Sequence, residues 1–244
     1  MMVVMSNFRD KLKDGVAQYG IALDDDRLYK FYLFYELLTE WNKKINLTTI
    51  ESENDVIIKH FLDSLFPVLF EDPGNWGTTL DLGTGAGFPG IPLKITYQNL
   101  NLTLVDSTKK KIDFLNHVIK ELNLENITVI HGRAEELGIN TNFREKFFVV
   151  ISRAVAPLNT LSEYCLPFVK TGGKMIAYKS QDIENEISEA ENAIQILGGK
   201  IKNVSRETIP LSNIGRSIII INKVTNTPGK YPRRNGVPKK KPLK

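Results

Sequence analysis

The residues of this chain whose types suit ligand chemistry gather around a glycine-rich segment, residues 80–92, which reads LDLGTGAGFPGIP. Gly83 and Gly85 follow a short apolar run, and glycines at such a point let the backbone turn tightly and approach a ligand closely. Asp106 ends the next apolar run, 23 residues after Gly83. A carboxylate at this spacing can accept hydrogen bonds from both hydroxyls of a ribose. The segment therefore predicts a ligand that contains a nucleoside.

Two kinds of nucleoside ligand fit these glycines. Residues 85–90 match the GxGxxG pattern, which would suit an NAD(P)-dependent oxidoreductase. Pro89 and Pro92, however, remove amide donors that a pyrophosphate would need. S-adenosylmethionine carries no phosphate, and its sulfonium favours a nearby carboxylate such as Asp81. We therefore expect S-adenosylmethionine as the cofactor. The alternatives are the oxidoreductase and a non-catalytic RNA-binding module with a vestigial loop.

The segment Ser152–Pro157, after the fourth expected strand, bears on which atom receives the methyl group. It lacks the Asn/Asp-Pro-Pro-aromatic sequence that is usual in enzymes methylating exocyclic base amines. Methylation of a pyrimidine at C5 needs a cysteine nucleophile, but Cys165 is expected inside a helix among apolar neighbours, where thiols are usually inert. Guanine N7 has a free lone pair at neutral pH and needs positioning rather than a general base. The scarcity of acid–base candidates fits guanine N7.

Two further segments supply candidate site residues. Arg153 is the candidate catalytic residue, because its guanidinium can bond a guanine edge or hold a phosphate. A structural ion pair with a nearby carboxylate is the alternative role for Arg153. Ala134 and Glu135 follow the third expected strand and are expected beside an adenine. The alternative for Glu135 is an acidic residue in the first turn of a short helix.

The elements that would position these residues alternate between strands and helices after residue 76. Strands are expected at 79–82, 100–106, 127–131, 147–151 and 173–179. Helices are expected at 92–97, 108–123, 157–168 and 182–197. Residues 200–209 and 217–224 follow as two strands with only a turn between them. Parallel βα units that end in an antiparallel hairpin predict an α/β, doubly wound, Rossmann-like sheet, as in class I methyltransferases.

The sequence divides into three parts of different character. Residues 1–75 form an N-terminal helical extension, with helices expected at 6–19, 25–42 and 54–70 and a loop at 72–75. Residues 76–224 form the Rossmann-like domain. Residues 225–244 form a basic C-terminal tail that carries no acidic residue. The whole chain has a net charge of +4 and this tail contributes +7, which leaves −3 for the rest.

The basic tail and the overall composition indicate the class of partner. A concentrated basic segment on an acidic body is a footprint of nucleic-acid contact, with a merely solvated tail as the alternative. One cysteine and three widely spaced histidines give no disulfide framework and no metal site, so no metal is expected. No apolar run approaches the ~20 residues that span a bilayer. We expect a soluble, cytoplasmic monomer whose RNA contacts come from six tail residues: Lys230, Arg233, Arg234, Lys239, Lys240 and Lys241.

Several short motifs, taken in order, resemble one family. They are WNKKINLT at 41–48, HFLDSL at 60–65, the glycine-rich segment, GRAE at 132–135, ISRAVA at 151–156 and TPGKYPRR at 227–234. Together they resemble the bacterial small-subunit ribosomal RNA methyltransferase G family, also called glucose-inhibited division protein B.

The resemblance implies N7 methylation of one guanosine in 16S ribosomal RNA, free or in a small-subunit particle, with S-adenosylmethionine as the donor. It also implies that 41–48 and 60–65 lie on the substrate side of the cofactor, although core packing is the alternative for Trp41. His60 and Asp63 could instead pair with each other. By position in the family motifs, the implied cofactor contacts are Gly83, Phe88, Asp106, Ser107, Thr108, Ala134, Glu135 and Arg153.

Overall fold

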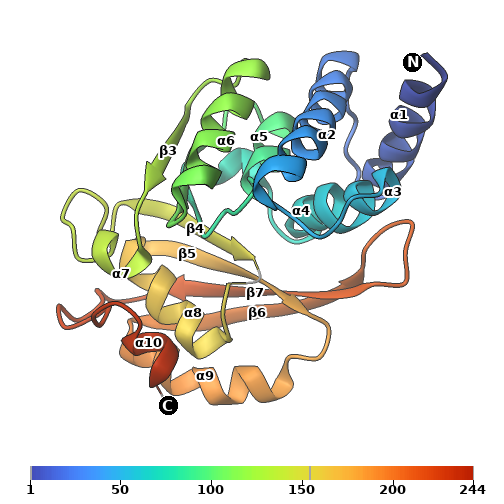
Figure 1. The fold of residues 1–244 in the computed structure, drawn as a ribbon. Coiled ribbons are helices and arrows are strands. Elements are labelled where there is room, and N and C mark those ends of the chain that lie inside the picture. Colours follow the sequence, from blue (N-terminus) through green and yellow to red (C-terminus); the bar gives the residue numbers. More distant parts are fainter. Residues whose placement is uncertain (1, 154, 244) are drawn as a thin grey trace.

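The expected strands form one sheet in the computed structural model, which describes residues 2–153 and 155–243. The sheet has the order β3-β2-β1-β4-β5-β7-β6 and runs across the whole molecule (Figure 1). Its strands are β1 (Thr78–Leu82), β2 (Asn101–Asp106), β3 (Ile127–His131), β4 (Phe147–Arg153), β5 (Val169–Ser180), β6 (Gly199–Thr208) and β7 (Gly215–Lys223).

The direction of the strands confirms the predicted topology. β1 to β5 pair in parallel, whereas β7 runs antiparallel between β5 and β6. β1 pairs with both β2 and β4, so the chain leaves β1 toward one side of the sheet and later returns to its other side. In an open α/β sheet, such a reversal of strand order leaves a crevice beyond the carboxyl ends of the strands, where ligands bind.

Successive side chains of the central strands enter two different cores. Ile218 and Ile220 of β7 pack into the core under the N-terminal helices, and Ile219 and Ile221 pack into the opposite core. This alternation follows from the two-residue period of a strand, and helices cover both faces because both faces are apolar. The connecting helices are α5 (Gly90–Thr96), α6 (Lys109–Glu121), α7 (Ala134–Leu137), α8 (Leu158–Cys165), the 3₁₀ turn η4 (Leu166–Phe168) and α9 (Glu184–Ile196).

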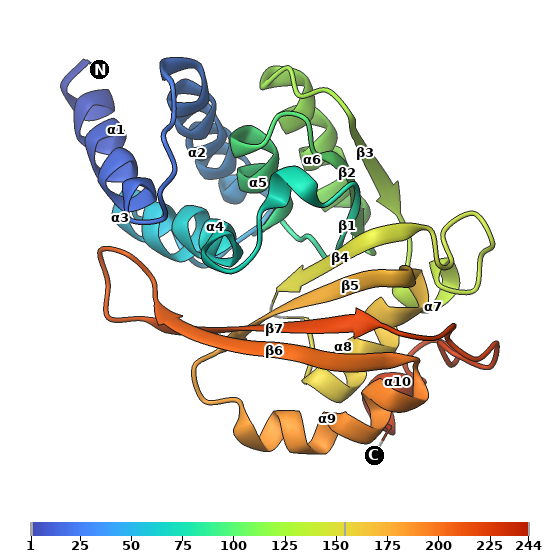
Figure 2. The ribbon, with the colours of Figure 1, turned by 180° about the vertical axis from the view of Figure 1, so that it is seen from behind.

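The N-terminal extension packs against the same core as α5 and α6. Its elements are α1 (Met2–Ala17), α2 (Asp25–Ile45), α3 (Glu53–Val56), the π-helix η1 (Ile57–Leu62), α4 (Asp63–Leu65) and the 3₁₀ helices η2 (Phe66–Leu69) and η3 (Pro73–Asn75). Asp24 caps α2 by accepting from the amide of Arg27 at 2.8 Å. Figure 2 shows these helices on one side of the sheet, with the β6–β7 turn reaching toward them.

The expected single helix at 54–70 is interrupted by the π-helical turn of η1. In this stretch, side-chain hydroxyls donate hydrogen bonds to backbone carbonyls. The Tyr19 hydroxyl donates to the carbonyl of Leu62 at 3.1 Å, and the Ser64 hydroxyl donates to that of His60 at 2.5 Å. Single π turns inside α-helices occur frequently at functional sites. The 3₁₀ turn η3 occupies the loop that was expected at 72–75.

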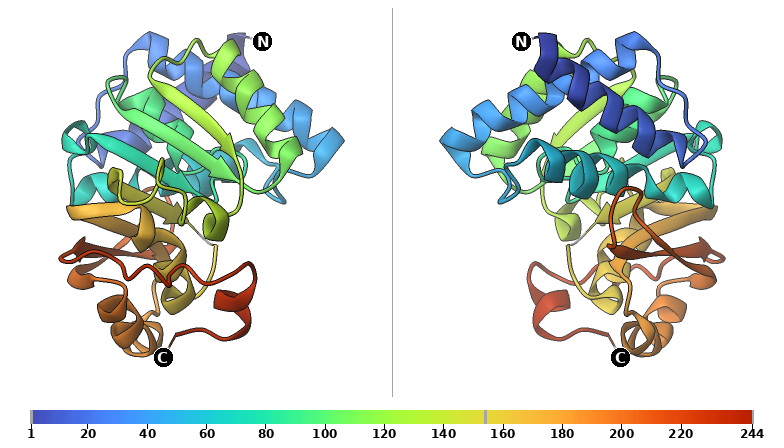
Figure 3. Two further views of the ribbon diagram at one scale, coloured as in Figure 1. Left: turned by 90° about the vertical axis from the view of Figure 1, so that its left-hand side faces the viewer. Right: turned by 90° about the vertical axis from the view of Figure 1, so that its right-hand side faces the viewer.

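The C-terminal segment lies along the body of the protein. After β7 the chain passes α7 and ends near α8 with the short helix α10 (Val237–Lys240) (Figure 3). Tyr231 and Pro238 are buried there, and Tyr231 belongs to the core beneath α8 and α9. The basic tail is thus packed against the domain over most of its length.

Candidate functional site

A pocket of about 180 Å³ lies where the sheet order reverses, at the carboxyl ends of β1, β2 and β3. Three pairs of neighbouring residues form its walls: Leu82–Gly83, Asp106–Ser107 and Ala134–Glu135. Val155 and Tyr164 close it on the side of α8. This is the position at which α/β folds bind nucleosides. The structure thus brings together five of the residues expected to contact the cofactor: Gly83, Asp106, Ser107, Ala134 and Glu135.

The glycine loop has a backbone conformation that residues other than glycine adopt only with strain. Gly83, Gly85 and Gly87 have φ angles of +74°, +63° and +94°. A Cβ on Gly83 would also lie 2.6 Å from Cγ2 of Val155. Glycine is therefore required at Gly83 on two grounds, its left-handed conformation and the close approach of Val155.

Asp106 organises the loop and faces the pocket. Its Oδ2 accepts from the amide of Gly85 at 2.9 Å, and its Oδ1 accepts from the amide of Thr108 at 2.8 Å. The Lys111 ammonium lies 3.7 Å from Oδ2. Each carboxylate oxygen has a second lone pair, so Asp106 can still accept from the two hydroxyls of a ribose. The donor and acceptor set of this pocket fits the nucleoside part of S-adenosylmethionine.

Five residues expected at the cofactor do not line this pocket: Asp81, Gly85, Phe88, Thr108 and Arg153. Asp81 is fully buried, and its Oδ2 accepts from the Thr84 hydroxyl at 2.7 Å and from the Gly90 amide at 2.8 Å. Asp81 therefore ties the glycine loop to α5 and does not line the pocket. Phe88 stacks on the ring of His60 at 4.3 Å between centroids and packs on the side of η1. The loop thus contacts the N-terminal extension through Phe88.

Burial raises the pKa of Asp81 to about 7, and the bonds from Thr84 and Gly90 oppose the shift. Its Oδ1 has no hydrogen-bond partner. A raised folded-state pKa means that Asp81 contributes stability at low pH, and that this contribution is lost as pH rises from about 4 to about 7. Over this pH interval, we expect the free energy of unfolding of Asp81→Asn to fall less than that of the wild-type protein, by at most about 4 kcal/mol. Urea unfolding at pH 4.5 to 7.5 measures this pH dependence, and Asp113→Asn, at an exposed position, is the control. Equal slopes for Asp81→Asn and the wild-type protein would contradict the prediction.

A second, larger cavity of about 620 Å³ adjoins the first, and Val155 lines both. Its walls come from η1, from the end of β4, from the end of β5 and from the start of β7. Four of its lining residues are basic: Lys59, Arg153, Lys179 and Arg216. The Lys179 ammonium pairs with Glu186 and donates to the carbonyl of Ala156 at 2.7 Å. The basic walls suit an anionic or electron-rich substrate.

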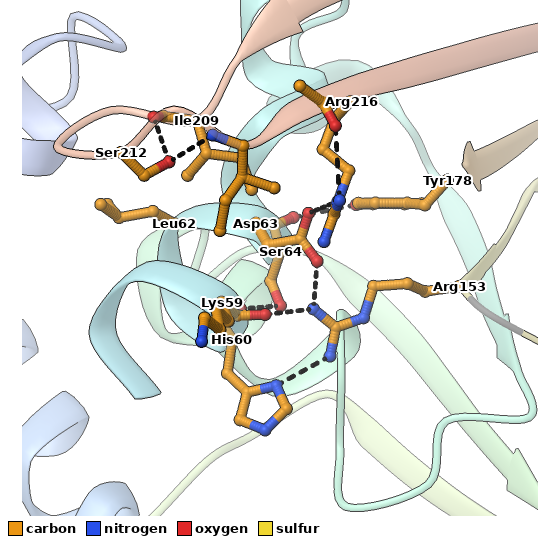
Figure 4. Close-up of polar contacts among 12 residues, drawn as sticks. Lys59, His60, Leu62, Asp63, Ser64, Arg153, Tyr178, Ile209, Ser212 and Arg216 are labelled. Carbon is orange, nitrogen blue, oxygen red and sulfur yellow. Dashed lines mark hydrogen bonds and ion pairs between the residues drawn. The ribbon is translucent and has the colours of Figure 1, made fainter. Parts of the chain in front are cut away.

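Arg153 is held in this cavity by the N-terminal extension, as Figure 4 shows. Its Nη1 donates to Oδ2 of Asp63 at 2.7 Å and to the carbonyl of Lys59 at 3.2 Å. Asp63 is buried, and its Oδ1 accepts from Nε of Arg216 at 2.8 Å. The alternative of a structural ion pair for Arg153 is therefore confirmed. Because Arg153 also lines the cavity, the same side chain remains available to a substrate.

His60 is a neutral member of the same cluster. Its Nδ1 lies 3.3 Å from Nη2 of Arg153, and its Nε2 lies 2.9 Å from the Thr48 hydroxyl. Burial, and then the charge of Arg153, lowers the pKa of His60 to about 3. Since a guanidinium can only donate, Nδ1 is the acceptor and Nε2 carries the proton toward Thr48. His60 and Asp63, which could have paired with each other, instead both contact Arg153.

Sequence reasoning missed Lys59, Lys179 and Arg216 as site residues. Arg216 follows a turn between two strands, and its neighbours carry no pattern that marks a site. Lys179 ends the strand expected at 173–179, and a basic residue at a strand end is common on any surface. Only their shared cavity identifies them. Trp41 packs on Phe114 at 5.5 Å between ring centroids, as its core-packing alternative predicted.

The basic tail residues differ in their surroundings. Lys230, Arg234, Lys239, Lys240 and Lys241 are exposed. Arg233 instead makes an ion pair with the fully buried Glu163, with 2.6 Å between Nη2 and Oε2. Five of the six residues expected to contact RNA are thus accessible, and the sixth has a partner inside the protein.

Comparisons with known proteins show the family of this chain. The family model described as rRNA small subunit methyltransferase G matches residues 27–213. The ribosomal RNA small subunit methyltransferase G of Alkaliphilus metalliredigens is 47% identical over 233 residues, which cover 96% of this chain and 98% of that protein. The namesake from Lachnoclostridium phytofermentans is 49% identical and covers 94% and 95%. The chain belongs to the rRNA small subunit methyltransferase G family.

Solved structures support the fold. The complex of the Haloferax volcanii Trm112 activator with a putative methyltransferase matches with a TM-score of 0.56 and 11% identity, over 77% of this chain and 98% of that one. M. jannaschii TYW2 in complex with AdoMet matches with a TM-score of 0.50 and 16% identity, over 64% and 72%. The predicted class I methyltransferase fold, with S-adenosylmethionine as methyl donor, is confirmed, and the oxidoreductase alternative finds no support. Among the described residues, every helix is too short or too polar to span a bilayer.

Proposed function

We propose that this protein transfers the methyl group of S-adenosylmethionine to N7 of one guanosine in the 16S ribosomal RNA of the small subunit. The observation that carries the proposal is the pair of adjoining cavities that share Val155. One is a nucleoside pocket organised by Asp106, and the other has four basic residues in its lining. The names of the relatives, which methylate small-subunit ribosomal RNA, give the substrate class. Such a substrate places the protein in the cytoplasm.

The basic cavity suits guanine N7 as the acceptor. Guanine presents N7 and O6 on one edge, and a guanidinium that donates to O6 holds this edge while the lone pair of N7 stays free to attack the methyl group. Arg153 and Arg216 are held in place by Asp63, so they meet a substrate already oriented. Lys59 and Lys179 suit the flanking phosphates.

The chemistry requires no proton transfer by the chain. The methyl group comes from the sulfonium of S-adenosylmethionine, and N7 attacks with a lone pair that carries no proton. The titratable groups described around the cavity fit this requirement: Asp63 and Glu186 are ion-paired, and His60 is neutral with Nδ1 facing Arg153. The residues around the larger cavity therefore bind and orient the substrate. Asp106 is assigned to the ribose of the cofactor.

The cleavage of 16S ribosomal RNA at 7-methylguanosine tests the proposal. Cells that lack the gene are expected to lose cleavage at one guanosine, because the proposal assigns the methylation of that guanosine to this protein. The wild-type gene should restore the cleavage, and Arg153→Ala should not. Persistence of the cleavage in the deletion strain would contradict the guanine N7 assignment. The same comparison with free RNA and with isolated small-subunit particles as substrates identifies the form that is methylated.

A further inference from the structure

The C-terminal segment 227–240 is bound to the domain by polar contacts. Arg144, in the loop after α7, donates from Nη2 to the carbonyl of Thr227 at 2.6 Å. Its Nη1 donates to the carbonyl of Tyr231 at 2.7 Å and to that of Gly138 at 2.9 Å. One guanidinium thereby joins the end of α7 to the C-terminal segment. The segment has a fixed path beside the cofactor pocket.

Arg233 ties the same segment to α8. Its backbone amide donates to Oε1 of Glu163 at 2.8 Å, its Nε donates to the same oxygen at 2.9 Å, and its Nη2 donates to Oε2 at 2.6 Å. Glu163 is fully buried, and a buried carboxylate left without a partner is destabilising, so Arg233 supplies a partner that this site needs. The next residue of α8, Tyr164, lines the pocket assigned to the cofactor.

The last turn of the segment reaches α7, the other wall of the pocket. The amide of Gly236 donates to Oε1 of Glu135 at 3.0 Å, and Nδ2 of Asn235 donates to Oε1 of Glu136 at 2.6 Å. The Thr160 hydroxyl of α8 donates to the carbonyl of Pro238 at 3.3 Å. The C-terminal segment therefore contacts both α7 and α8.

We propose that the C-terminal segment is a positioning element of the cofactor pocket, which holds Glu135 and Tyr164 at the distance that S-adenosylmethionine requires. α7 has four residues, and so short a helix does not hold its own orientation. The contacts of Gly236 and Arg233 supply that orientation from outside. The proposal rests on the assignment of this pocket to the cofactor, and it gives the basic tail a role separate from RNA contact.

Calorimetric titration of the full chain with S-adenosylmethionine, without RNA, tests the proposal. We expect Arg233→Gln to raise the Kd about tenfold, as for a coupled site of moderate strength. Arg234→Gln removes the same charge from an exposed neighbour and should leave the Kd unchanged. A loss of stability alone would lower the fraction of binding-competent protein but not the Kd of the folded fraction. An unchanged Kd in Arg233→Gln would overturn the proposal.

A second variant decides the matter if Arg233→Gln does not fold. Gly236 has a φ of +77° and donates its amide to Glu135, so Gly236→Pro removes both the conformation and the donor. We expect a raised Kd for S-adenosylmethionine here too, and an unchanged Kd would overturn the proposal. A triple change of Lys239, Lys240 and Lys241 to Gln keeps these contacts. It should leave the cofactor Kd unchanged while reducing the salt dependence of RNA binding.

Asp106→Ala separates failure of this proposal from failure of the site assignment. If Asp106→Ala binds S-adenosylmethionine normally, the pocket itself is wrongly assigned. If Asp106→Ala loses binding while Arg233→Gln and Gly236→Pro keep it, the pocket is correct and the positioning role of the C-terminal segment is wrong.

Discussion

Arg153→Ala is expected to lower kcat/KM for ribosomal RNA by about 10²-fold, the loss expected when a residue that positions the reacting base is removed. Arg153 lines the larger cavity and is bonded there by the N-terminal extension. Its guanidinium bonds Asp63 and Lys59 and lies 5.2 Å from the centre of the Phe88 ring. A methyl transfer to a neutral nitrogen places positive charge on the base, so the role of Arg153 is to fix the electron-rich edge rather than to neutralise charge.

The measurement is single-turnover methylation with S-adenosylmethionine in excess, together with the Kd of the cofactor. Arg153→Lys keeps the charge but loses the fork that bonds Asp63, Lys59 and His60, and should recover little of the rate. Arg206→Ala, which removes an exposed ion pair with Glu184, is the matched control and should keep the wild-type rate, because neither residue lines the cavity. A normal rate in Arg153→Ala would assign this side chain to structure alone.

Asp106→Ala is expected to raise the Kd of S-adenosylmethionine by at least about 100-fold. Hydrogen bonds to a charged group contribute about 1.5–3 kcal/mol each, and two ribose hydroxyls would lose their acceptor. The glycine loop would also lose the bond from the Gly85 amide to Oδ2, and the start of α6 the bond from the Thr108 amide to Oδ1.

Calorimetric titration with S-adenosylmethionine and with S-adenosylhomocysteine measures this effect, because both ligands carry the same ribose. Asp113→Ala, on the exposed face of α6 next to Lys109, is the control for loss of a carboxylate from this region. Similar weakening of both ligands would place the effect at the ribose. Unchanged binding of either ligand would show that the ribose does not meet Asp106.

The predictable part of the site follows from local rules. The short strand β1, the left-handed glycines and the carboxylate that ends β2 lie within 30 residues of one another. Their backbone conformations and hydrophobic periods are properties of each short segment, so composition and spacing suffice to find them. The same holds for the antiparallel ending of the sheet, since no helix intervenes between β6 and β7.

Asp81 and Phe88 belong to the same glycine-rich segment, residues 80–92, but their surroundings were not predictable. The strand pattern places Asp81 beside the glycines, yet its side chain points under the loop toward Gly90. Phe88 takes its neighbours from η1, an element whose π turn the sequence did not reveal. A spacing rule gives the position of a residue along the chain, whereas the direction of its side chain depends on what packs against it.

The sequence by itself determined the fold class, the nucleoside pocket and the family of this protein. The tertiary structure alone decided how the basic residues are used. Arg153 meets Asp63 across 90 positions, Arg216 meets Asp63 across 153, and Arg233 meets Glu163 across 70. A buried carboxylate holds whichever guanidinium the fold brings to it, and neither partner carries a local signal of the pairing. The contacts that orient Arg153 and that bind the C-terminal segment to the cofactor pocket therefore exist only in the folded chain.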